Sequence, residues 1–268
     1  MFARVSIIMG IYNCESTLAE AIDSILSQTY MDWKLIMCDD GSEDNTYKLA
    51  ERYQKKYSDQ IILIMNDRNR GLNYTLNHCL KYADTEYVAR MDGDDISLPT
   101  RLEKEVEFLD SHPKYAVVSC PMIYFDENGE FMLGRETGEP TLESMVRKTP
   151  FCHAPCLVRR EAYEAVHGYA VADNRLRVED WDLWIRMYEK GFKGFMLDEY
   201  LYAMRDDRNA ISRRKMKYRL NEARVGASAV KKLKLSPINY VLCLRPILVG
   251  LLPRSVYKVL HILKGKIK

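Results

Sequence analysis

Residues Tyr87–Pro99, YVARMDGDDISLP, decide how the rest of this 268-residue chain is interpreted. An apolar run typical of a buried strand ends in Asp92-Gly93-Asp94-Asp95, where the like charges stand so close that each carboxylate needs a cation or a hydrogen-bond donor. We expect Gly93 to let the backbone turn sharply, so that Asp92 and Asp94 converge on one point. Oxygen ligands of this kind suit Mg²⁺ or Mn²⁺. The alternative is a solvated turn between a strand and a helix.

Strand-like and helical patterns alternate four times before this stretch ends. Strands are expected at residues 4–9, 33–38, 60–65 and 87–91, and the helices between them should begin near Thr17, after Ser42 as N-cap, and near Gly71. Such alternation predicts a mostly parallel sheet with helices on both faces. Ligands bind beyond the carboxyl ends of strands in such sheets, which is where the acidic stretch stands. Neither GxGxxG nor GxxxxGK[ST] occurs. If a nucleotide phosphate binds here, we therefore expect a metal held by Asp92–Asp95 to bind it.

The second half of the chain is less regular. Its expected elements are a helix at 99–111, a long strand at 115–125, a turn at 126–129, helices at 141–148 and 161–167, and strands at 193–197 and 200–204. Glu179-Asp180-Trp181-Asp182 should open a further helix, whose dipole favours acids at its start. Such acids often serve only as caps. The neighbouring tryptophans favour a sugar pocket instead, because aromatic faces match pyranose rings.

The charge is unevenly distributed. Residues 205–268 carry 17 Lys and Arg against 3 Asp and Glu, whereas the whole chain has a net charge of only +2. The split predicts an acidic body and a basic tail that meets anions. Residues 254–268 alternate apolar side chains with lysines, as helices in a membrane interface do. The alternative is a helix pair packed on the domain. Nucleic acid is disfavoured as a partner, because the body is acidic and no binding motif occurs.

Cysteines and apolar runs bound the cellular setting. The seven cysteines are scattered without a CxxC, which fits free thiols in a reducing cytosol. Cys152, His153 and Cys156 lie close together, but no second pair completes a zinc site. The N-terminus runs straight into a strand, which predicts a protein that is neither secreted nor cleaved. No stretch reaches the ~18 apolar residues that a membrane span needs.

Four segments stand in one order along the chain and together resemble the family-two glycosyltransferases of the GT-A fold, in their bacterial surface-polysaccharide branch. The segments are VSIIMGIYN (5–13), CDDGSEDNT (38–46), ARMDGDDISLPTRLEKE (89–105) and EDWDLWIR (179–186). The resemblance covers roughly residues 3–215. It implies an α/β GT-A domain at 1–212, with a nucleotide-sugar half at 1–98 and an acceptor half at 99–212, followed by a basic helical segment at 213–268.

The resemblance also implies a nucleotide-diphospho-sugar donor, usually a UDP-sugar, and Mn²⁺ or Mg²⁺ as cofactor. The residues that it assigns to the nucleotide sugar are Tyr12, Asp40, Asp92 and Gly93. Asp94 would bind the metal, together with Asp92. Family members commonly carry a histidine ligand after the last strand; Asp207 stands there, and its carboxylate also suits a hard cation. Gly10 stands where a hydroxyl residue is frequent.

The expected reaction is a single in-line displacement at the anomeric carbon, with inversion. Asp180 matches the family's catalytic base; an unperturbed Asp, with a pKa near ~3.9, is ionised at neutral pH. The acceptor would be a glycan or a lipid-pyrophosphate-linked sugar, reached from the cytoplasm by an enzyme held peripherally on the inner membrane face. Two rival functions are a catalytically silent nucleotide-sugar-binding protein and a nucleotidyltransferase. The latter typically needs a glycine-rich loop that Gly10-Ile11-Tyr12-Asn13 does not supply.

Overall fold

A computed structural model of the chain describes residues 3–206 and 215–251. Asp207, expected as a metal ligand, lies outside these residues. So does the distal part of the expected basic tail, from residue 252 onward.

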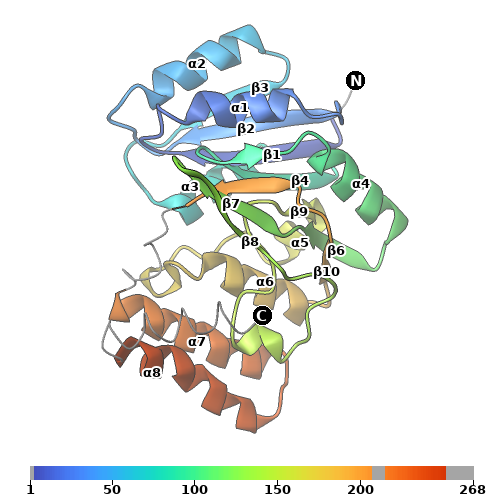
Figure 1. Ribbon diagram of the computed structural model, residues 1–268, viewed down its shortest axis with the longest axis vertical. Helices are drawn as coiled ribbons and strands as arrows, with labels where there is room; N and C mark the ends of the chain where they lie inside the picture. Colours follow the sequence, from blue (N-terminus) through green and yellow to red (C-terminus); the bar gives the residue numbers. More distant parts are fainter. Residues whose placement is uncertain (1–2, 207–214, 252–268) are drawn as a thin grey trace.

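A seven-stranded sheet forms the centre of the molecule (Figure 1). Its spatial order is β10-β6-β9-β4-β1-β2-β3, and the strands are β1 (Val5–Ile11), β2 (Trp33–Asp39), β3 (Ile61–Met65), β4 (Tyr87–Asp92), β6 (Tyr115–Ser119), β9 (Leu157–Arg159) and β10 (Lys193–Met196). All neighbours are parallel except β9, which runs antiparallel between β4 and β6. The expected mostly parallel sheet is confirmed. Gly10 pairs with both Cys38 and Asp92, so β1, β2 and β4 end at the same edge.

Helices cover both faces of this sheet, as expected. Because successive strand side chains point to opposite faces, Ile7 and Ile8 of β1 belong to two different cores. Ile7 packs in the core covered by α1 (Leu18–Leu26), α2 (Thr46–Lys56) and α4 (Arg101–Ser111). Ile8 packs in the core covered by α3 (Leu72–Leu80), α5 (Arg160–Ala165) and α6 (Glu179–Glu189).

A second, four-stranded sheet lies beside the first, in the order β5-β11-β7-β8. Its strands are β5 (Ile96–Ser97), β7 (Met122–Asp126), β8 (Gly129–Leu133) and β11 (Tyr202–Arg205). The single long strand expected at 115–125 is wrong: β6 and β7 belong to different sheets. Pro121 stands between them, and proline cannot donate the N–H that a continuous ladder needs. The expected turn at 126–129 is confirmed as the tip of the β7–β8 hairpin.

Two expected helical features differ in the structure. The helix expected at 141–148 is only a 3-10 turn at Ser144–Val146. Ser42 is not an N-cap, because α2 begins at Thr46. The Ser42 hydroxyl instead donates to Asp39 Oδ1 at 2.6 Å, so it is used within the loop that follows β2.

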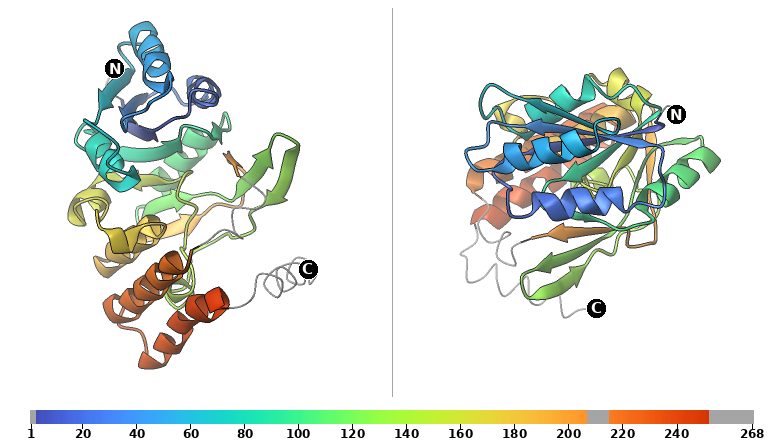
Figure 2. Two further views of the ribbon diagram at one scale, coloured as in Figure 1. Left: turned by 90° about the vertical axis from the view of Figure 1, so that its left-hand side faces the viewer. Right: turned by 90° about the horizontal axis from the view of Figure 1, so that it is seen from above.

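The C-terminal part of the described chain is helical, as expected. It consists of α7 (Met216–Lys232), the 3-10 helix η4 (Pro237–Leu244) and α8 (Arg245–Leu251). Figure 2 shows α7 and α8 stacked at the end of the molecule opposite α2. Val225 and Ala229 of α7 are buried in the same core as α6. No helix within residues 3–206 and 215–251 is long and apolar enough to cross a membrane.

Candidate active site

Three carboxylates converge where β4 ends. One oxygen each of Asp92, Asp94 and Asp95 lies within 4.8 Å of the others. Burial, followed by the charge of Asp92, raises the pKa of Asp94 and raises that of Asp95 to about 8. The cluster therefore carries more negative charge than its surroundings offset, and a divalent cation would relieve that repulsion.

The second sheet holds Asp95 in place. Asp95 is only 2% exposed; the Tyr202 hydroxyl donates to its Oδ2 at 2.9 Å, and the Arg205 backbone N–H donates to its Oδ1 at 2.8 Å. The Asp92 N–H in turn donates to the Tyr202 hydroxyl at 3.3 Å. The β11 strand thus fixes two members of the cluster. Tyr202 was not predicted as a site residue, because no pattern in the sequence around β11 connects it to the acids more than 100 residues earlier.

A buried arginine lies beside the cluster. Arg90 is 3% exposed and shares one face of β4 with Asp92, whose Oδ1 accepts from Arg90 Nη2 at 2.6 Å. Burial by itself lowers the pKa of Arg90, but Asp92 and the other acidic groups around it, Asp95 among them, together raise that pKa above its usual range. Arg90 therefore stays cationic. Arg90 was not predicted as a site residue, although a charged side chain inside an otherwise apolar strand could have indicated it.

Gly93 lies in the turn expected after β4, and Asp92 and Asp94 converge beyond it as expected. Its backbone is not in the left-handed region, so close packing rather than a positive φ favours glycine there. A Cβ atom at Gly93 would lie 3.0 Å from Cys14 Sγ and 3.2 Å from Ile11 Cγ2. The Gly93 carbonyl accepts a hydrogen bond from Thr17 Oγ1 at 3.0 Å. A glycine here lets the acidic loop lie directly against the end of β1.

Asp40 and Tyr12, the residues expected at the nucleoside, lie at the same sheet edge. Asp40 is buried; its Oδ1 accepts from the Arg70 N–H at 2.8 Å and from Asn66 Nδ2 at 2.7 Å, and its Oδ2 accepts from the Gly71 N–H at 2.8 Å. Asp40 therefore anchors the loop that leads into α3. Tyr12 is exposed at the end of β1.

A cleft of about 1110 Å³ joins the acidic cluster to the acids at the start of α6. Its lining includes Arg90, Asp92 and Asp94 as well as Glu179 and Asp180. Tyr12, Asp40 and Gly93 lie outside its lining. The other walls come from the β7–β8 hairpin, the segment before β9, and α7; they include Met122, Tyr124, Met132, Leu133, Thr149, Phe151, His153, Tyr218 and Glu222. Carboxylates far apart in the sequence thus face a common space.

Asp180 sits in the first turn of α6. Its Oδ2 accepts from Thr149 Oγ1 at 2.9 Å, and burial raises its pKa. A carboxylate with a raised pKa is a stronger base. Asp182, two residues further along α6, is instead ion-paired with Arg175 at 2.7 Å and with Arg186 at 2.8 Å. Asp182 therefore secures the helix, whereas Asp180 faces the cleft.

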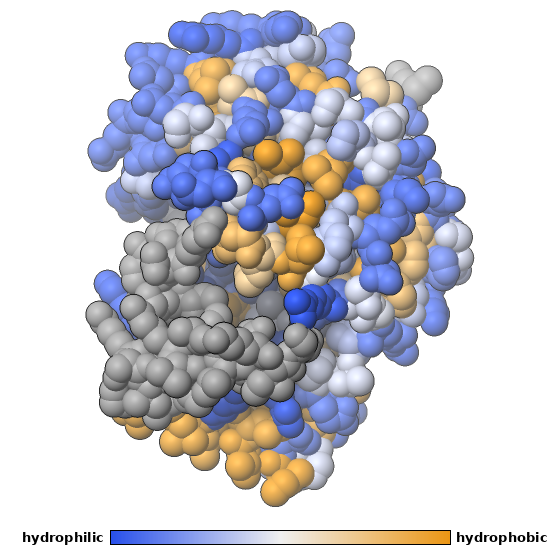
Figure 3. All heavy atoms as spheres, viewed as in Figure 1, coloured by the Kyte–Doolittle hydropathy of each residue, from blue (hydrophilic) through white to orange (hydrophobic). Residues whose placement is uncertain are grey.

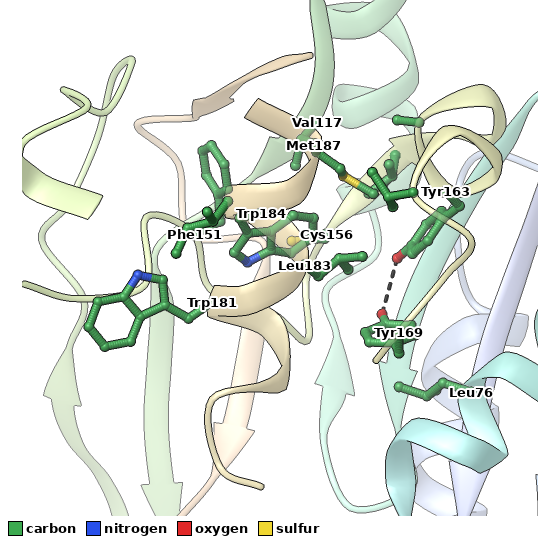
Figure 4. Close-up of a cluster of buried hydrophobic side chains, with 14 of the residues drawn as sticks. Leu76, Val117, Phe151, Cys156, Tyr163, Tyr169, Trp181, Leu183, Trp184 and Met187 are labelled. Carbon is green, nitrogen blue, oxygen red and sulfur yellow. Dashed lines mark hydrogen bonds between the residues drawn. The ribbon is translucent and has the colours of Figure 1, made fainter. Parts of the chain in front are cut away.

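A cleft lies beside these acids, but the expectation that the tryptophans contribute to a sugar pocket is wrong. Trp181 and Trp184 are both buried in the core, and neither lines the cleft (Figure 4). Trp181 Nε1 donates to the Met145 carbonyl at 2.6 Å. Their positions on α6 place them on its inward face together with Leu183 and Met187, both of which are also buried.

The sequence of the chain matches a known protein family. The model of the family "Glycosyl transferase family 2" matches residues 6–166. The putative glycosyltransferase EpsE of Bacillus subtilis (strain 168) is 45% identical over 258 residues, 96% of this chain and 93% of EpsE. The chain belongs to glycosyltransferase family 2. The resemblance carried by the four sequence segments is thereby confirmed.

Two further proteins resemble this glycosyltransferase. The UDP-Glc:alpha-D-GlcNAc-diphosphoundecaprenol beta-1,3-glucosyltransferase WfgD of Escherichia coli is 41% identical over 107 residues, 39% of this chain and 40% of WfgD. The solved structure of mannosyltransferase PcManGT from Pyrobaculum calidifontis, in complex with GDP-Man and Mn²⁺, has a TM-score of 0.69 at 18% identity and covers all of this chain and 82% of that one. The likeness confirms the expected GT-A fold.

The acidic cluster of the glycosyltransferase suits a divalent cation. Asp92 and Asp94 offer hard oxygen donors next to a buried Asp95. Burial and then the neighbouring carboxylates raise the pKa of Asp94 and of Asp95, and a bound cation would favour the charged forms of both. Asp95 already accepts hydrogen bonds at both oxygens, so Asp92 and Asp94 are the better placed ligands.

Proposed function

We propose that this enzyme transfers a sugar, with inversion, from a UDP-sugar to a hydroxyl of a glycan or lipid-linked acceptor in surface-polysaccharide synthesis. The observation that carries the proposal is the single cleft shared by Asp92, Asp94 and Asp180. A UDP-sugar and a diphosphoundecaprenol acceptor both appear in the name of WfgD, which supports these two choices. Residues 1–98 would hold the donor and residues 99–212 the acceptor.

The donor side is assigned to the edge where β1, β2 and β4 end. Tyr12 and Asp40 contact the nucleoside, and Asp92 with Gly93 contacts the nucleotide sugar. Asp94 and Asp92 hold Mn²⁺ or Mg²⁺; the Mn²⁺ bound to PcManGT supports this. When bound, the cation acts as a Lewis acid that offsets charge on the leaving nucleoside diphosphate. Asp207 remains a predicted further ligand.

The acceptor side is assigned to Asp180. As the acceptor oxygen attacks the anomeric carbon, the bond to the donor phosphate breaks, and Asp180 takes the hydroxyl proton. Thr149 orients the carboxylate through its 2.9 Å hydrogen bond. Arg90 adds positive charge at the cleft wall, beside the Asp92 carboxylate. Inversion requires the base and the leaving diphosphate to lie on opposite sides of the sugar.

The Asp180→Asn variant tests the assignment of the base. It should abolish transfer while leaving UDP binding nearly intact, because the amide keeps the shape of the carboxylate but cannot take a proton. The neighbouring Glu179→Gln variant is the control and should retain most transfer. Retained transfer by Asp180→Asn, with UDP binding lost, would refute the assignment. Release of UDP rather than pyrophosphate separates this reaction from nucleotidyl transfer, and donor hydrolysis sensitive to Asp180→Asn separates it from silent binding.

The cellular place of the enzyme is part of the proposal. Its acceptors would be carried on lipid at the cytoplasmic face of the membrane, and the basic segment 213–268 would be attracted to anionic lipid there. The +14 balance of residues 205–268 supports this.

A further inference from the structure

Among residues 3–206 and 215–251, nothing covers an apolar face on the C-terminal helices. We call it the apolar C-terminal face; its residues, on η4 and α8, are Ile238, Tyr240, Val241, Leu244, Leu248 and Leu251. These side chains are 44–71% exposed. Figure 3 shows apolar atoms gathered at the lower end of the molecule, where Figure 1 places α7 and α8. Contiguous exposed apolar surface of this kind marks a contact with a partner or a membrane.

The other side of the same segment is already packed on the domain. Cys243 is buried, and Leu242 packs against the core that contains Val225. Gly226 of α7 lies so close to the domain that a Cβ atom there would be 2.7 Å from the Val146 carbonyl oxygen and 3.3 Å from Cys243 Sγ. The segment cannot roll over to bury its outer side chains without losing these contacts. The apolar C-terminal face therefore points outward because of how the helices are docked.

The charges around this face select the kind of partner. Residues 223–268 carry ten Lys and Arg and no Asp or Glu. Within the described part of this stretch, exposed Lys231 and Lys234 stand just before η4, and exposed Arg245 is the first residue of α8. Protein interfaces are depleted of lysine, whereas apolar side chains interleaved with lysine and arginine suit the boundary between acyl chains and anionic headgroups.

We infer that the apolar C-terminal face inserts into the surface of an anionic membrane. In this arrangement η4 and α8 lie in the plane of the interface, with Val241, Leu244 and Leu248 among the acyl chains and the basic side chains at the headgroup phosphates. The inference rests on the proposed location at the membrane, and it replaces a purely electrostatic tail by apolar insertion of a defined surface. Because Tyr218 and Glu222 of α7 line the cleft, the helix that leads to this face also borders the site of transfer.

The test is flotation of the full-length chain with vesicles of mixed phosphatidylglycerol and phosphatidylcholine. The variant combines Val241→Ser, Leu244→Ser and Leu248→Ser. Moving one aliphatic side chain from water into hydrocarbon changes an equilibrium roughly tenfold. Partial insertion of three should therefore make the variant bind about a hundredfold more weakly. Raised salt should weaken wild-type binding only in part, because salt screens the headgroup attraction and not the apolar insertion.

A matched control replaces three comparably exposed apolar residues elsewhere. Met31→Ser, Met65→Ser and Val171→Ser alter side chains that are 56–61% exposed, and this combination should float like the wild type. Equal flotation of the two triple variants, or no flotation of the wild type, would overturn the inference. So would a wild-type dimer that the face variant dissociates, or stronger flotation after truncation at Leu251, since residues 252–268 would then cover the face.

Donor hydrolysis keeps the two proposals separate. The face variant should release UDP from a UDP-sugar at the wild-type rate, because none of its changed residues lines the cleft. If wild-type protein floats and the face variant does not, the membrane contact stands even when no UDP release is seen. If both release UDP and both float equally, the proposed function stands and the apolar contact is refuted.

Discussion

Removal of the Tyr202 hydroxyl would show how strongly β11 controls the acidic cluster. That hydroxyl is fully buried, donates to Asp95 Oδ2 at 2.9 Å and accepts from the Asp92 N–H at 3.3 Å. Tyr202→Phe leaves a buried carboxylate oxygen and a backbone N–H without this partner. Leaving a buried polar group unsatisfied costs about 1–3 kcal/mol, so we expect unfolding to cost about 2 kcal/mol less. Groups that orient metal ligands affect metal affinity roughly 10–100-fold.

Calorimetry of UDP binding, with and without Mn²⁺, measures the functional part of this loss. Tyr202→Phe should weaken Mn²⁺-dependent UDP binding about tenfold, which is the lower end of the effect of groups that hydrogen-bond to metal ligands. It should leave UDP binding without metal unchanged. The control is Tyr200→Phe, which removes a hydroxyl only two residues away that donates to the Gly134 carbonyl at 2.7 Å. A Tyr202→Phe protein that is less stable yet binds UDP and Mn²⁺ normally would show that Tyr202 supports only the fold.

Three other variants probe separate contacts. Thr149→Val should slow transfer about tenfold with donor binding unchanged. The Thr149 hydroxyl lowers the pKa of Asp180, so its removal should raise that pKa and move the acidic limb of the pH–rate profile to higher pH. An unmoved profile would contradict this. Gly93→Ala should destabilise by about 1–3 kcal/mol in chemical denaturation, because its Cβ meets Cys14 Sγ at 3.0 Å. Cys14→Ala in the same chain should recover part of that, and strict additivity would argue against the clash. Burial raises the pKa of Glu105 to about 8. The stability that protonated Glu105 contributes is therefore fully present below its pKa in the unfolded chain and is lost as the pH rises to about 8. Glu105→Gln should flatten the dependence of the melting temperature on pH over that window. An equally steep dependence in the variant would disprove this.

Local patterns were sufficient for the sheet and for the position of the acids. The alternation of apolar runs and helical periods predicted β1 to β4 correctly, because side-chain periodicity follows from backbone geometry within a few residues. The position of the acids at the ligand-binding edge follows from that alternation, because parallel strands present their carboxyl ends at one edge of the sheet. The packing of Leu183 and Met187 inward was predictable for the same reason.

The errors arose where the determining contact was distant along the chain. Ser42 was expected to cap a helix, but its hydroxyl is taken by Asp39. Residues 115–125 looked like one strand, although Pro121 separates two sheets whose other members lie far away in sequence. Trp181 seemed suited to a sugar pocket, yet the rotation of α6 directs it into the core.

By itself the sequence determined which residue types this enzyme offers and the local elements that carry them: an acidic turn after a buried strand, a second acidic pair at a helix start, and a basic, apolar C-terminal segment. Only the tertiary structure decided that Asp180 faces the cleft of Asp92 and Asp94, and that Tyr202 and Arg90 hold the cluster. The reason is physical. Secondary structure is set by interactions over a few residues, whereas the direction of a side chain into a cleft depends on how whole elements pack against one another.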